Sequence, residues 1–414
     1  MCIFPSAGLD LHKSVQFPGL SKFSPYKKNP SIYIHIPFCG FKCDYCDFYS
    51  VPCRGAKETI PDVIPGILHQ LAMLDSVLNP PGYTTVYIGG GTPNVLSIGQ
   101  LELLIRGITP LVERSEKAGV GEGEWTVELN PEYITEEYIR LFADYPVSRI
   151  SIGVQSFQDR YLRRIGRHCT SAQIQEALKI TDKLWKGDVS IDLLCCMPGQ
   201  TEKDANDDIH EALQHNPEHI SYYTLTLEKG TPLAEAVAKR DLEYPDEQQQ
   251  LFLWEKGKSL LEAEGYMRYE VSNFSLPGKE CRHNLHYWEM DPYAGCGPGA
   301  VSTFPVGRTA LRYETRRQIS GRVVVDCEEI DEKAFLLEYI MMGFRMTRGI
   351  EKEKFRTVFG DNFSRIFNAE LQKWKDRHLV AEDAEHIALT DGGIIVLNSI
   401  ILDAAVAIDN IFTA

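Results

Sequence analysis

The stretch IHIPFCGFKCDYCDFYS, residues 34–50, decides which fold is expected of this chain. It places Cys39, Cys43 and Cys46 in a C-x3-C-x2-C spacing, directly after a short apolar run that predicts a β-strand. Three cysteines this close together on a loop indicate a metal site. A closed structural site usually takes four protein ligands, so this set is one ligand short.

Zinc is the first alternative for this loop. A structural zinc ion takes four nitrogen or sulfur ligands, commonly from C-x2-C pairs. Cys53 follows at a spacing that is not typical of zinc sites, and His35 alternates with two isoleucines, which favours packing on the strand. An iron–sulfur cube explains three cysteines better, because a [4Fe–4S] cluster with three thiolates leaves one iron open to a small molecule. We therefore expect the three cysteines to bind such a cluster.

Composition places the chain among globular proteins. It has 414 residues, of which 43% are hydrophobic and 24% charged, which predicts two or three domains. The formal net charge of −15 argues against a general nucleic-acid binder or a protein held on an anionic membrane by charge. No apolar run is long enough for a transmembrane helix, and no secretory signal is evident, so a cytoplasmic location is expected. Most other cysteines are expected to be reduced and buried, namely Cys2, Cys53, Cys169, Cys195, Cys196 and Cys327.

Strand and helix patterns alternate over the first half of the chain, which predicts parallel βαβ units. Two closures are compatible with this pattern, an open doubly wound sheet and a barrel. Glycines and polar residues stand at the expected carboxyl ends of the strands, where barrel enzymes place their chemistry, so a full or partial barrel is favoured. The strands are expected at 31–36, 84–90, 125–131, 148–156, 189–199 and 219–227.

The pattern changes after residue 240, where longer polar helices and an aromatic, glycine-rich stretch follow. We expect an α/β fold consisting of a partial parallel barrel and a smaller, mainly helical C-terminal domain. The predicted parts are an N-terminal arm at 1–30, the barrel with the cluster loop at 31–240, a barrel extension at 241–310 and the helical domain at 311–414.

The cluster stretch, followed by an aromatic residue, resembles the radical SAM superfamily, and further motifs continue the resemblance in register. Within that superfamily the chain is similar to the branch that holds oxygen-independent coproporphyrinogen III dehydrogenase (HemN) and the heme chaperone HemW. The matching motifs are GGGTP at 89–93, VELNP at 127–131, SIGVQSF at 151–157, IGRHC at 165–169, SIDLLCCMPGQT at 190–201 and TLEKGTP at 226–232.

The resemblance implies two cofactors, a [4Fe–4S] cluster and S-adenosylmethionine (SAM), whose reductive cleavage gives a 5′-deoxyadenosyl radical. It implies that Tyr33 packs against SAM, that the turn at Gly90, Gly91 and Thr92 receives its methionine end, and that Glu128 faces one of its polar groups. Further positions that the resemblance assigns to the cofactor site are Tyr45, Gln155, Arg167 and Asp192.

Two features favour the chaperone over the dehydrogenase. Phe48 stands where the dehydrogenase has a fourth cysteine, and about 30 residues precede Tyr33, fewer than the dehydrogenase uses over its substrate. The chaperone branch is marked by H-N-x-x-Y-W, which this chain carries as HNLHYW at 283–288. Imidazole is a common axial ligand of heme iron, so His283 is the expected heme ligand. Cys281 and His286 are competing ligands, and a purely structural role of His283 is the other alternative.

The expected function is therefore that of a heme chaperone that binds the cluster, SAM and heme and passes heme to an acceptor protein, which is membrane-associated in one version of this hypothesis. The alternative is a SAM-dependent oxidoreductase similar to the dehydrogenase. Whether SAM is cleaved and whether the chain forms a homodimer stay open. One position departs from the family pattern, because Cys196 replaces a glycine near the expected adenosine site.

Overall fold

The computed structural model of this chain describes residues 16–23, 28–52, 60–121, 123–319 and 323–413. Cys2, Cys53 and most of the expected N-terminal arm lie outside these ranges. Within them, a sheet of 12 strands forms the frame of the molecule, in the order β14-β13-β12-β11-β1-β4-β5-β6-β7-β8-β10-β9. None of the helices in the described ranges is both long and apolar enough to cross a bilayer.

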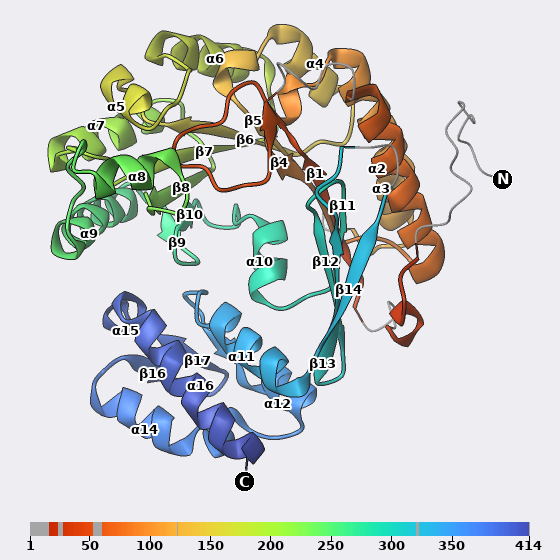
Figure 1. Cartoon of the computed structure of the whole chain (residues 1–414), viewed down its shortest axis with the longest axis vertical. Coiled ribbons are helices and arrows are strands. Elements are labelled where there is room, and N and C mark those ends of the chain that lie inside the picture. Colours follow the sequence, from red (N-terminus) through yellow and green to blue (C-terminus); the bar gives the residue numbers. More distant parts are fainter. Residues whose placement is uncertain (1–15, 24–27, 53–59, 122, 320–322, 414) are drawn as a thin grey trace.

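The middle of the sheet is a curved set of parallel strands (Figure 1). Each of its neighbouring pairs is parallel, from β11 through β1 to β8. The expected partial barrel is therefore confirmed. Its strands are β1 (Ser31–Ile36), β4 (Thr85–Gly90), β5 (Glu124–Leu129), β6 (Arg149–Gln155), β7 (Asp188–Cys195), β8 (His219–Thr224) and β11 (Tyr293–Cys296).

Helices cover the outer face of this curved sheet (Figure 1). Several of them start at capping boxes, such as the one at Ser97 before α3, where the side chain accepts from the Gln100 backbone N–H and satisfies an unpaired helix donor. The covering helices are α2 (Ile60–Leu78), α3 (Ile98–Lys117), α4 (Glu136–Ala143), α5 (Asp159–Arg164), α6 (Ser171–Leu184), α7 (Glu202–Leu213), α8 (Pro232–Ala238) and α9 (Glu247–Ala263).

The two faces of the sheet differ in polarity. Along β5, Trp125, Val127 and Leu129 belong to the apolar core beneath the helices. The alternating positions Glu124 and Glu128 face inward, because successive side chains of a strand point to opposite faces. A parallel sheet covered on both sides normally has apolar residues on both faces. The polar inner face of this sheet is therefore the place to look for a functional site.

Antiparallel strands extend both edges of the parallel set. They are β9 (Met267–Arg268) and β10 (Asn273–Ser275) on one side, and β12 (Val301–Val306), β13 (Thr309–Thr315) and β14 (Val325–Ile330) on the other. The sequence did not indicate the second group, since β14 is mostly exposed and lacks an apolar alternation. β13 spans the predicted boundary at 310/311, and the helical part begins at α11. The division into domains stays a prediction.

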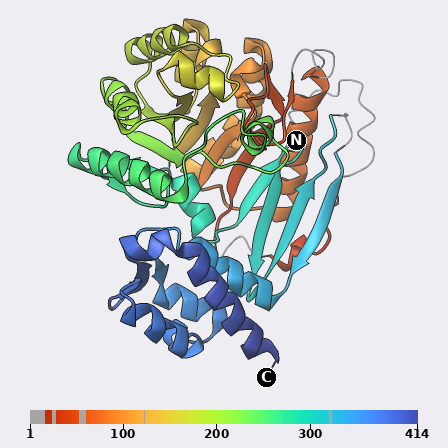
Figure 2. The same ribbon diagram turned by 60° about the vertical axis from the view of Figure 1, so that its left-hand side comes forward.

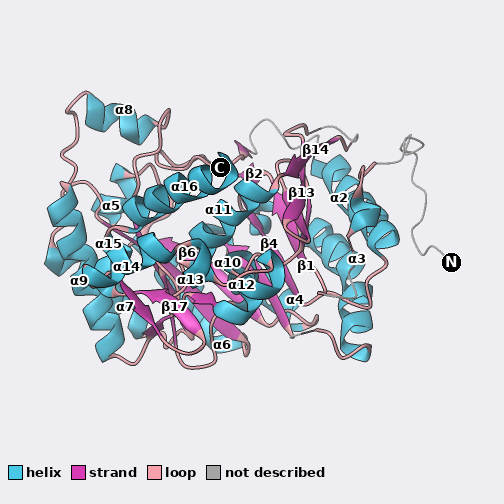
Figure 3. Cartoon of the chain, turned by 90° about the horizontal axis from the view of Figure 1, so that it is seen from below, coloured by secondary structure: helices cyan, strands magenta, loops and turns pink. Residues whose placement is uncertain are grey.

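The C-terminal part has its own apolar core and lies below the sheet in Figure 2. Seen from below, its helices lie in front of the strands (Figure 3). Helix α10 (Arg282–Trp288) contacts both β4 and α11, so it connects the sheet with this part. The elements are α11 (Glu332–Gly343), α12 (Lys352–Phe359), α13 (Phe363–Ile366), α14 (Asn368–Asp376), α15 (Asp391–Ile395), α16 (Leu397–Thr413) and the strands β15 (Ile350–Glu351), β16 (Val380–Glu382) and β17 (His386–Leu389).

Candidate cluster and cofactor site

A cavity of about 340 Å³ lies at the carboxyl ends of the parallel strands, beneath the cysteine loop. The structure brings nearly all the predicted site residues together around it, although they come from six separate segments of the chain. Those that line it are Cys39, Cys43, Tyr45, Cys46, Gly90, Gly91, Thr92, Glu128, Gln155, Arg167 and Asp192. Tyr33 and His283 do not line it and are described below.

The cysteine loop follows β1 and is held by backbone hydrogen bonds. Asp44 N–H donates to the carbonyl of Ile165, and the carbonyl of Asp44 accepts from Leu233 N–H. The thiols have polar neighbours on the cavity side. The Thr92 hydroxyl lies 3.4 Å from the Cys39 sulfur, and the Arg167 guanidinium lies 4.0 Å from the Cys43 sulfur.

Burial raises the pKa of the Cys43 thiol and raises that of Cys46 to about 11. These thiols are therefore protonated at neutral pH and release their protons when they bind a metal. Among the described residues, no group of three or more His, Cys, Asp or Glu is gathered closely enough to hold one metal ion. A zinc ion with Zn–S bonds of about 2.3 Å needs such a gathering. A cube, in which each thiolate binds a different iron, does not, and the loop suits it better.

The glycine turn after β4 packs directly beneath this loop. Gly91 N–H donates to the carbonyl of Ile36 at 2.8 Å. A Cβ atom at Gly91 would collide with the Phe38 carbonyl, and Gly90 has a φ of 105°, which favours glycine. Gly91 is thus required by the close approach of two backbone segments, and Gly90 by its positive φ and the nearby ring of His35. The same absence of side chains leaves the turn open to the cavity.

Two carboxyl groups face the cavity without a hydrogen-bonded cation among the described residues. Burial raises the pKa of Glu128 to about 7 and that of Asp192 to about 6. Glu128 accepts from the Tyr87 hydroxyl at 2.7 Å and from Gly90 N–H at 3.1 Å. Asp192 accepts from the Ser151 hydroxyl at 3.3 Å. Buried carboxylates of this kind are stabilised by a cationic ligand.

The buried cation of the site is Arg167, and its guanidinium is directed to other groups. It donates to the Asn130 side-chain oxygen at 3.0 Å and to the Gly153 carbonyl. It also lies 3.9 Å from a carboxylate oxygen of Glu132. Gly153 is on β6, so Arg167 ties the segment after α5 to the strand end and borders the cavity beside the cluster loop.

Tyr33 is not among the residues that line the cavity, and its contact with SAM stays a prediction. Its hydroxyl is 3.0 Å from Nδ1 of His35, and its ring centroid is 6.2 Å from that of Tyr87. The other ring nitrogen of His35 contacts the carbonyl of Tyr49 at 3.0 Å, so His35 braces the cluster loop rather than ligating a metal.

His283 lies on α10 near the amino end of β4, away from the cysteine loop. It is 1% exposed, and both ring nitrogens have partners: Nδ1 is 2.7 Å from the Thr85 hydroxyl and Nε2 is 3.1 Å from the Tyr287 hydroxyl. Burial lowers the pKa of His283 to about 3, so the imidazole is neutral. Its ring is stacked on Tyr87, with centroids 5.0 Å apart.

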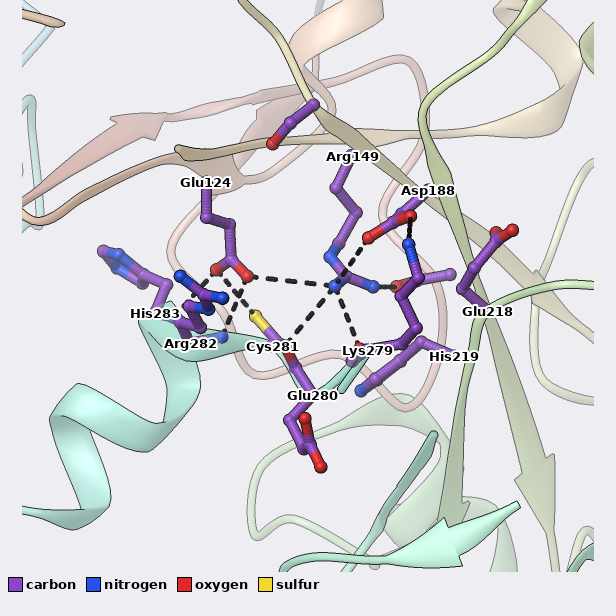
Figure 4. A network of polar contacts seen from close by, with 12 residues as sticks. Glu124, Arg149, Asp188, Glu218, His219, Lys279, Glu280, Cys281, Arg282 and His283 are labelled. Atoms are coloured by element: carbon purple, nitrogen blue, oxygen red, sulfur yellow. Dashed lines mark hydrogen bonds and ion pairs between the residues drawn. The ribbon is translucent and has the colours of Figure 1, made fainter. Parts of the chain in front are cut away.

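A network of charged side chains fixes the segment before His283 (Figure 4). Glu124 accepts backbone N–H bonds from Arg282 at 2.9 Å and from His283 at 2.8 Å. The buried guanidinium of Arg149 donates to the carbonyl of Lys279 at 3.0 Å and to a carboxylate oxygen of Asp188 at 3.3 Å. The sequence analysis missed this network, whose one signal is that charged residues stand at the amino ends of β5, β6 and β7.

The remaining members of the HNLHYW motif point in different directions. His286 pairs with Asp291 at 3.1 Å, and the thiol of Cys281 lies 3.5 Å from Glu124. Both competing ligands are therefore engaged elsewhere. The indole N–H of Trp288 is buried and has no hydrogen-bond partner, and the Arg345 guanidinium lies 5.3 Å from the Trp288 ring.

The structure also places Phe48, which distinguishes the chain from the dehydrogenase, and Cys196, which departs from the family pattern. Phe48 is 65% exposed at the rim of the cavity. Cys196 is buried and has a φ of 64°, a conformation that glycine adopts without strain. Its sulfur lies 3.7 Å from that of Cys195, and neither residue lines the cavity. The exchange therefore changes the turn after β7 and adds no side chain to the cavity wall.

Comparisons with known proteins agree with this geometry. The radical SAM superfamily model matches residues 33–212, and the HemN C-terminal domain model matches residues 330–396. Relatives named heme chaperone HemW, from Lactococcus lactis and Escherichia coli, are each 32% identical over 90% of this chain and 97% of the relative. The chain belongs to the HemW family. The motif at His283 and the cysteine loop are thus parts of one HemW-type radical SAM protein.

Two further comparisons show how widely this architecture occurs. A zebrafish (Danio rerio) relative, named radical S-adenosyl methionine domain-containing protein 1, mitochondrial, is 28% identical over 92% of this HemW-family chain and 88% of its own length. The solved structure of coproporphyrinogen III oxidase (HemN) from Escherichia coli has a TM-score of 0.72 at 17% identity and covers 92% of both chains. The last likeness confirms the fold and carries no statement about activity.

Proposed function

We propose that this chain is a heme chaperone that binds a [4Fe–4S] cluster, SAM and heme and delivers heme to an acceptor protein. The observation that carries the proposal is the neutral, buried imidazole of His283 within the HNLHYW motif, in a chain whose relatives are named heme chaperones. Neutral imidazole is the form that ligates heme iron, and aromatic rings suit a porphyrin face.

The cavity fits the cluster and SAM in its donor set. Cys39, Cys43 and Cys46 would each bind one iron of the cluster, which would leave the fourth iron open to SAM. When bound, the pair supplies a one-electron cleavage of the SAM sulfonium. The uncompensated carboxyls of Glu128 and Asp192 suit the cationic groups of SAM. Further residues proposed to line the SAM site are Tyr45, Gly90, Gly91, Thr92, Gln155 and Arg167.

Tyr33 is proposed to act on this site indirectly, because its hydroxyl contacts His35, which braces the cluster loop through Tyr49. It would therefore position the loop that carries the cluster. The reducing cytoplasm is the proposed location, since the cysteines of the described residues are free thiols.

Heme binding at His283 requires a rearrangement around α10, because the imidazole is 1% exposed and both ring nitrogens have partners. Nε2 is shared with the Tyr287 hydroxyl at 3.1 Å, so that hydroxyl must leave before iron binds. The unpartnered indole N–H of Trp288, five positions along the same motif, is a donor available to a polar group of the ligand. The donor chemistry of the motif therefore fits heme once α10 adjusts.

The test is heme titration of the anaerobically reconstituted protein. The wild type should bind about one heme with a Soret band, and His283→Ala should lose most of the band. His286→Ala is the matched control, because that histidine lies on the same helix and pairs with Asp291. If His283→Ala binds heme with unchanged affinity and spectrum, the assignment of the ligand is wrong. If the wild type takes up no heme at micromolar concentration, the proposed function is wrong.

The alternative function is a SAM-dependent oxidoreductase acting on a porphyrinogen. The sequence motifs suggest it, because they resemble the branch that holds both HemN and HemW. Against it, Phe48 occupies the position of the fourth cysteine of the dehydrogenase, as the sequence comparison indicates. An anaerobic assay with reductant, SAM and coproporphyrinogen III decides between them. Formation of protoporphyrinogen by the cluster-loaded protein would establish the alternative.

The acceptor is proposed to be a heme protein, either free or associated with a membrane. A homodimer is the proposed alternative to a monomeric chaperone. Pull-down of the heme-loaded chain against purified apo-cytochromes, together with sedimentation of the chaperone alone, tests both statements.

A further inference from the structure

One strand contacts both proposed binding sites. β4 places Thr85, Tyr87 and Gly89 on the inner face, because alternate side chains share a face. Thr85, at its amino end, contacts His283, and Gly90, at its carboxyl end, donates to Glu128 in the cavity. The residue midway between these ends is Tyr87.

Tyr87 touches a group of each site. Its hydroxyl donates to Glu128 Oε1 at 2.7 Å, and its ring is stacked on the imidazole of His283 with an interplanar angle of 28°. Two other aromatic rings lie near His283. The ring of Tyr33 is 6.4 Å away and its hydroxyl contacts His35, whereas the ring of Tyr287 is 5.0 Å away and its hydroxyl contacts His283 itself. Tyr87 is therefore the one side chain among the described residues with these two contacts.

We infer that Tyr87 couples the two sites, so that SAM bound beside Glu128 changes the affinity of His283 for heme. The inference rests on the proposed function and deepens it, because it names a positioning residue that links both ligands. Tyr87 itself is not a ligand of either cofactor.

The physical link begins at Glu128. A cation bound in the cavity favours the ionised carboxylate, which can only accept hydrogen bonds, and a charge-assisted bond holds the Tyr87 hydroxyl more firmly. The protonated carboxyl binds that hydroxyl less strongly and leaves the phenol more freedom. Burial keeps the pKa of Glu128 at about 7, so both forms are populated near neutral pH. The charge of Asp192 also acts on Glu128, and the phenols on which the charge of Glu128 acts are Tyr33, Tyr87, Tyr223 and Tyr287.

The link ends at the imidazole. Heme ligation requires the Nε2 atom of His283 to leave the Tyr287 hydroxyl, so the ring or the helix has to adjust. The stacked phenol of Tyr87 limits that adjustment on one side. A change in the position or freedom of the phenol therefore changes the free energy of heme binding.

The experiment measures heme affinity with and without saturating SAM, in the cluster-loaded full chain. We expect SAM to change the heme dissociation constant of the wild type by at least about fivefold, and heme to change the SAM dissociation constant by the same factor, as linkage requires. Tyr87→Phe keeps the ring and removes the hydroxyl. In this variant, SAM should change the heme dissociation constant by no more than about twofold.

Tyr293→Phe is the matched control. Tyr293 belongs to the same group of rings, 4.6 Å from Tyr287, but its hydroxyl contacts Thr303 and no cavity residue. It should keep the wild-type factor. S-adenosylhomocysteine, which lacks the sulfonium charge, should give a smaller factor than SAM.

A second measurement does not need heme. In protein carrying ¹³C-labelled histidine, the His283 signal, assigned with His283→Gln, should move on addition of SAM in the wild type and stay in place in Tyr87→Phe. If SAM leaves both the signal and the heme affinity of the wild type unchanged, or if Tyr87→Phe keeps the full factor, the coupling is wrong while the chaperone function stands. If heme binds without His283, the proposed ligand is wrong and the signal alone decides the coupling.

Discussion

The two ends of the same parallel strands are built in opposite ways. At the carboxyl ends, Glu128 and Asp192 face a cavity without a hydrogen-bonded cation, and the three thiols of the cysteine loop border it. At the amino ends, Glu124 accepts a hydrogen bond from the backbone N–H of Arg282, and Arg149 donates one to the backbone carbonyl of Lys279 (Figure 4). Both charged side chains thus hold the backbone at the start of α10 and before it.

This difference separates a site that needs ligands from a region that needs none. Buried polar groups are stable when they are paired, and each unpaired one carries a desolvation cost. At the amino end the chain's own residues supply most of these partners, although Nε of Arg149 has none. At the carboxyl end, Glu128 and Asp192 accept hydrogen bonds but have no hydrogen-bonded cation, and the proposed cluster and SAM would supply further partners. The comparison can be tested by substitutions at either end.

Loss of the cluster is the largest expected effect. Cys43→Ser should reduce the iron of the anaerobically reconstituted protein from about four atoms per chain to nearly none, because each thiolate of the set holds one iron. Iron and sulfide analysis measures it. Cys327→Ser is the control, since that thiol is exposed on β14 far from the loop, and it should keep full iron. Full iron in Cys43→Ser would show that the carboxyl end does not depend on this ligand.

Removal of one charge at the amino end should strongly destabilise the fold. Arg149→Met removes the buried cation beside Glu124, while Asp188 keeps its ion pair with Lys279, and should lower the free energy of unfolding by about 3–5 kcal/mol. Urea unfolding measures it. Arg316→Met breaks the exposed pair with Asp326 and should leave the midpoint unchanged. Equal effects of the two substitutions would contradict the structural role of the network.

At the carboxyl end, removal of a charge should raise the free energy of unfolding, and the size of this effect depends on pH. Burial raises the pKa of Glu128 to about 7, so the ligand-free folded state loses stability as pH rises from about 4.5 through 7, where the unfolded chain releases this proton first. Glu128→Gln removes this loss and should stabilise the ligand-free protein by about 2 kcal/mol more at pH 8 than at pH 5. Urea unfolding at both pH values measures the difference. Destabilisation at pH 8 would mean that Glu128 is already compensated.

The smallest expected effect concerns the hydrogen bond between Tyr287 and His283. Tyr287→Phe removes the hydroxyl that contacts Nε2 of His283, a hydrogen bond worth about 0.5–1.5 kcal/mol. Heme should therefore bind a few-fold more tightly to this variant than to the wild type, as measured by Soret titration. Weaker binding would indicate that the hydroxyl helps to hold heme rather than competing with it.

The sequence predicted the cavity far better than the region opposite. Cys39, Cys43 and Cys46 lie within one loop, and the other cavity residues stand in short motifs at strand ends, so local patterns reveal them. Arg149 and Glu124 act through partners more than 100 positions away, at Lys279 and His283. No local pattern records such pairs. The sequence did not predict a role for Tyr87 for the same reason. Its contacts to Glu128 and His283 join residues that are far apart in the chain.

The alternation along β4 has one further consequence. Thr85 and Tyr87 share the inner face because they are two positions apart, and the turn at Gly90 follows at a fixed distance. A shift of the strand by one residue would turn both side chains to the helix-covered face at once. A single-residue deletion within β4 would therefore remove the contacts to His283 and to Glu128 together. Both proposed sites therefore depend on the register of this one strand.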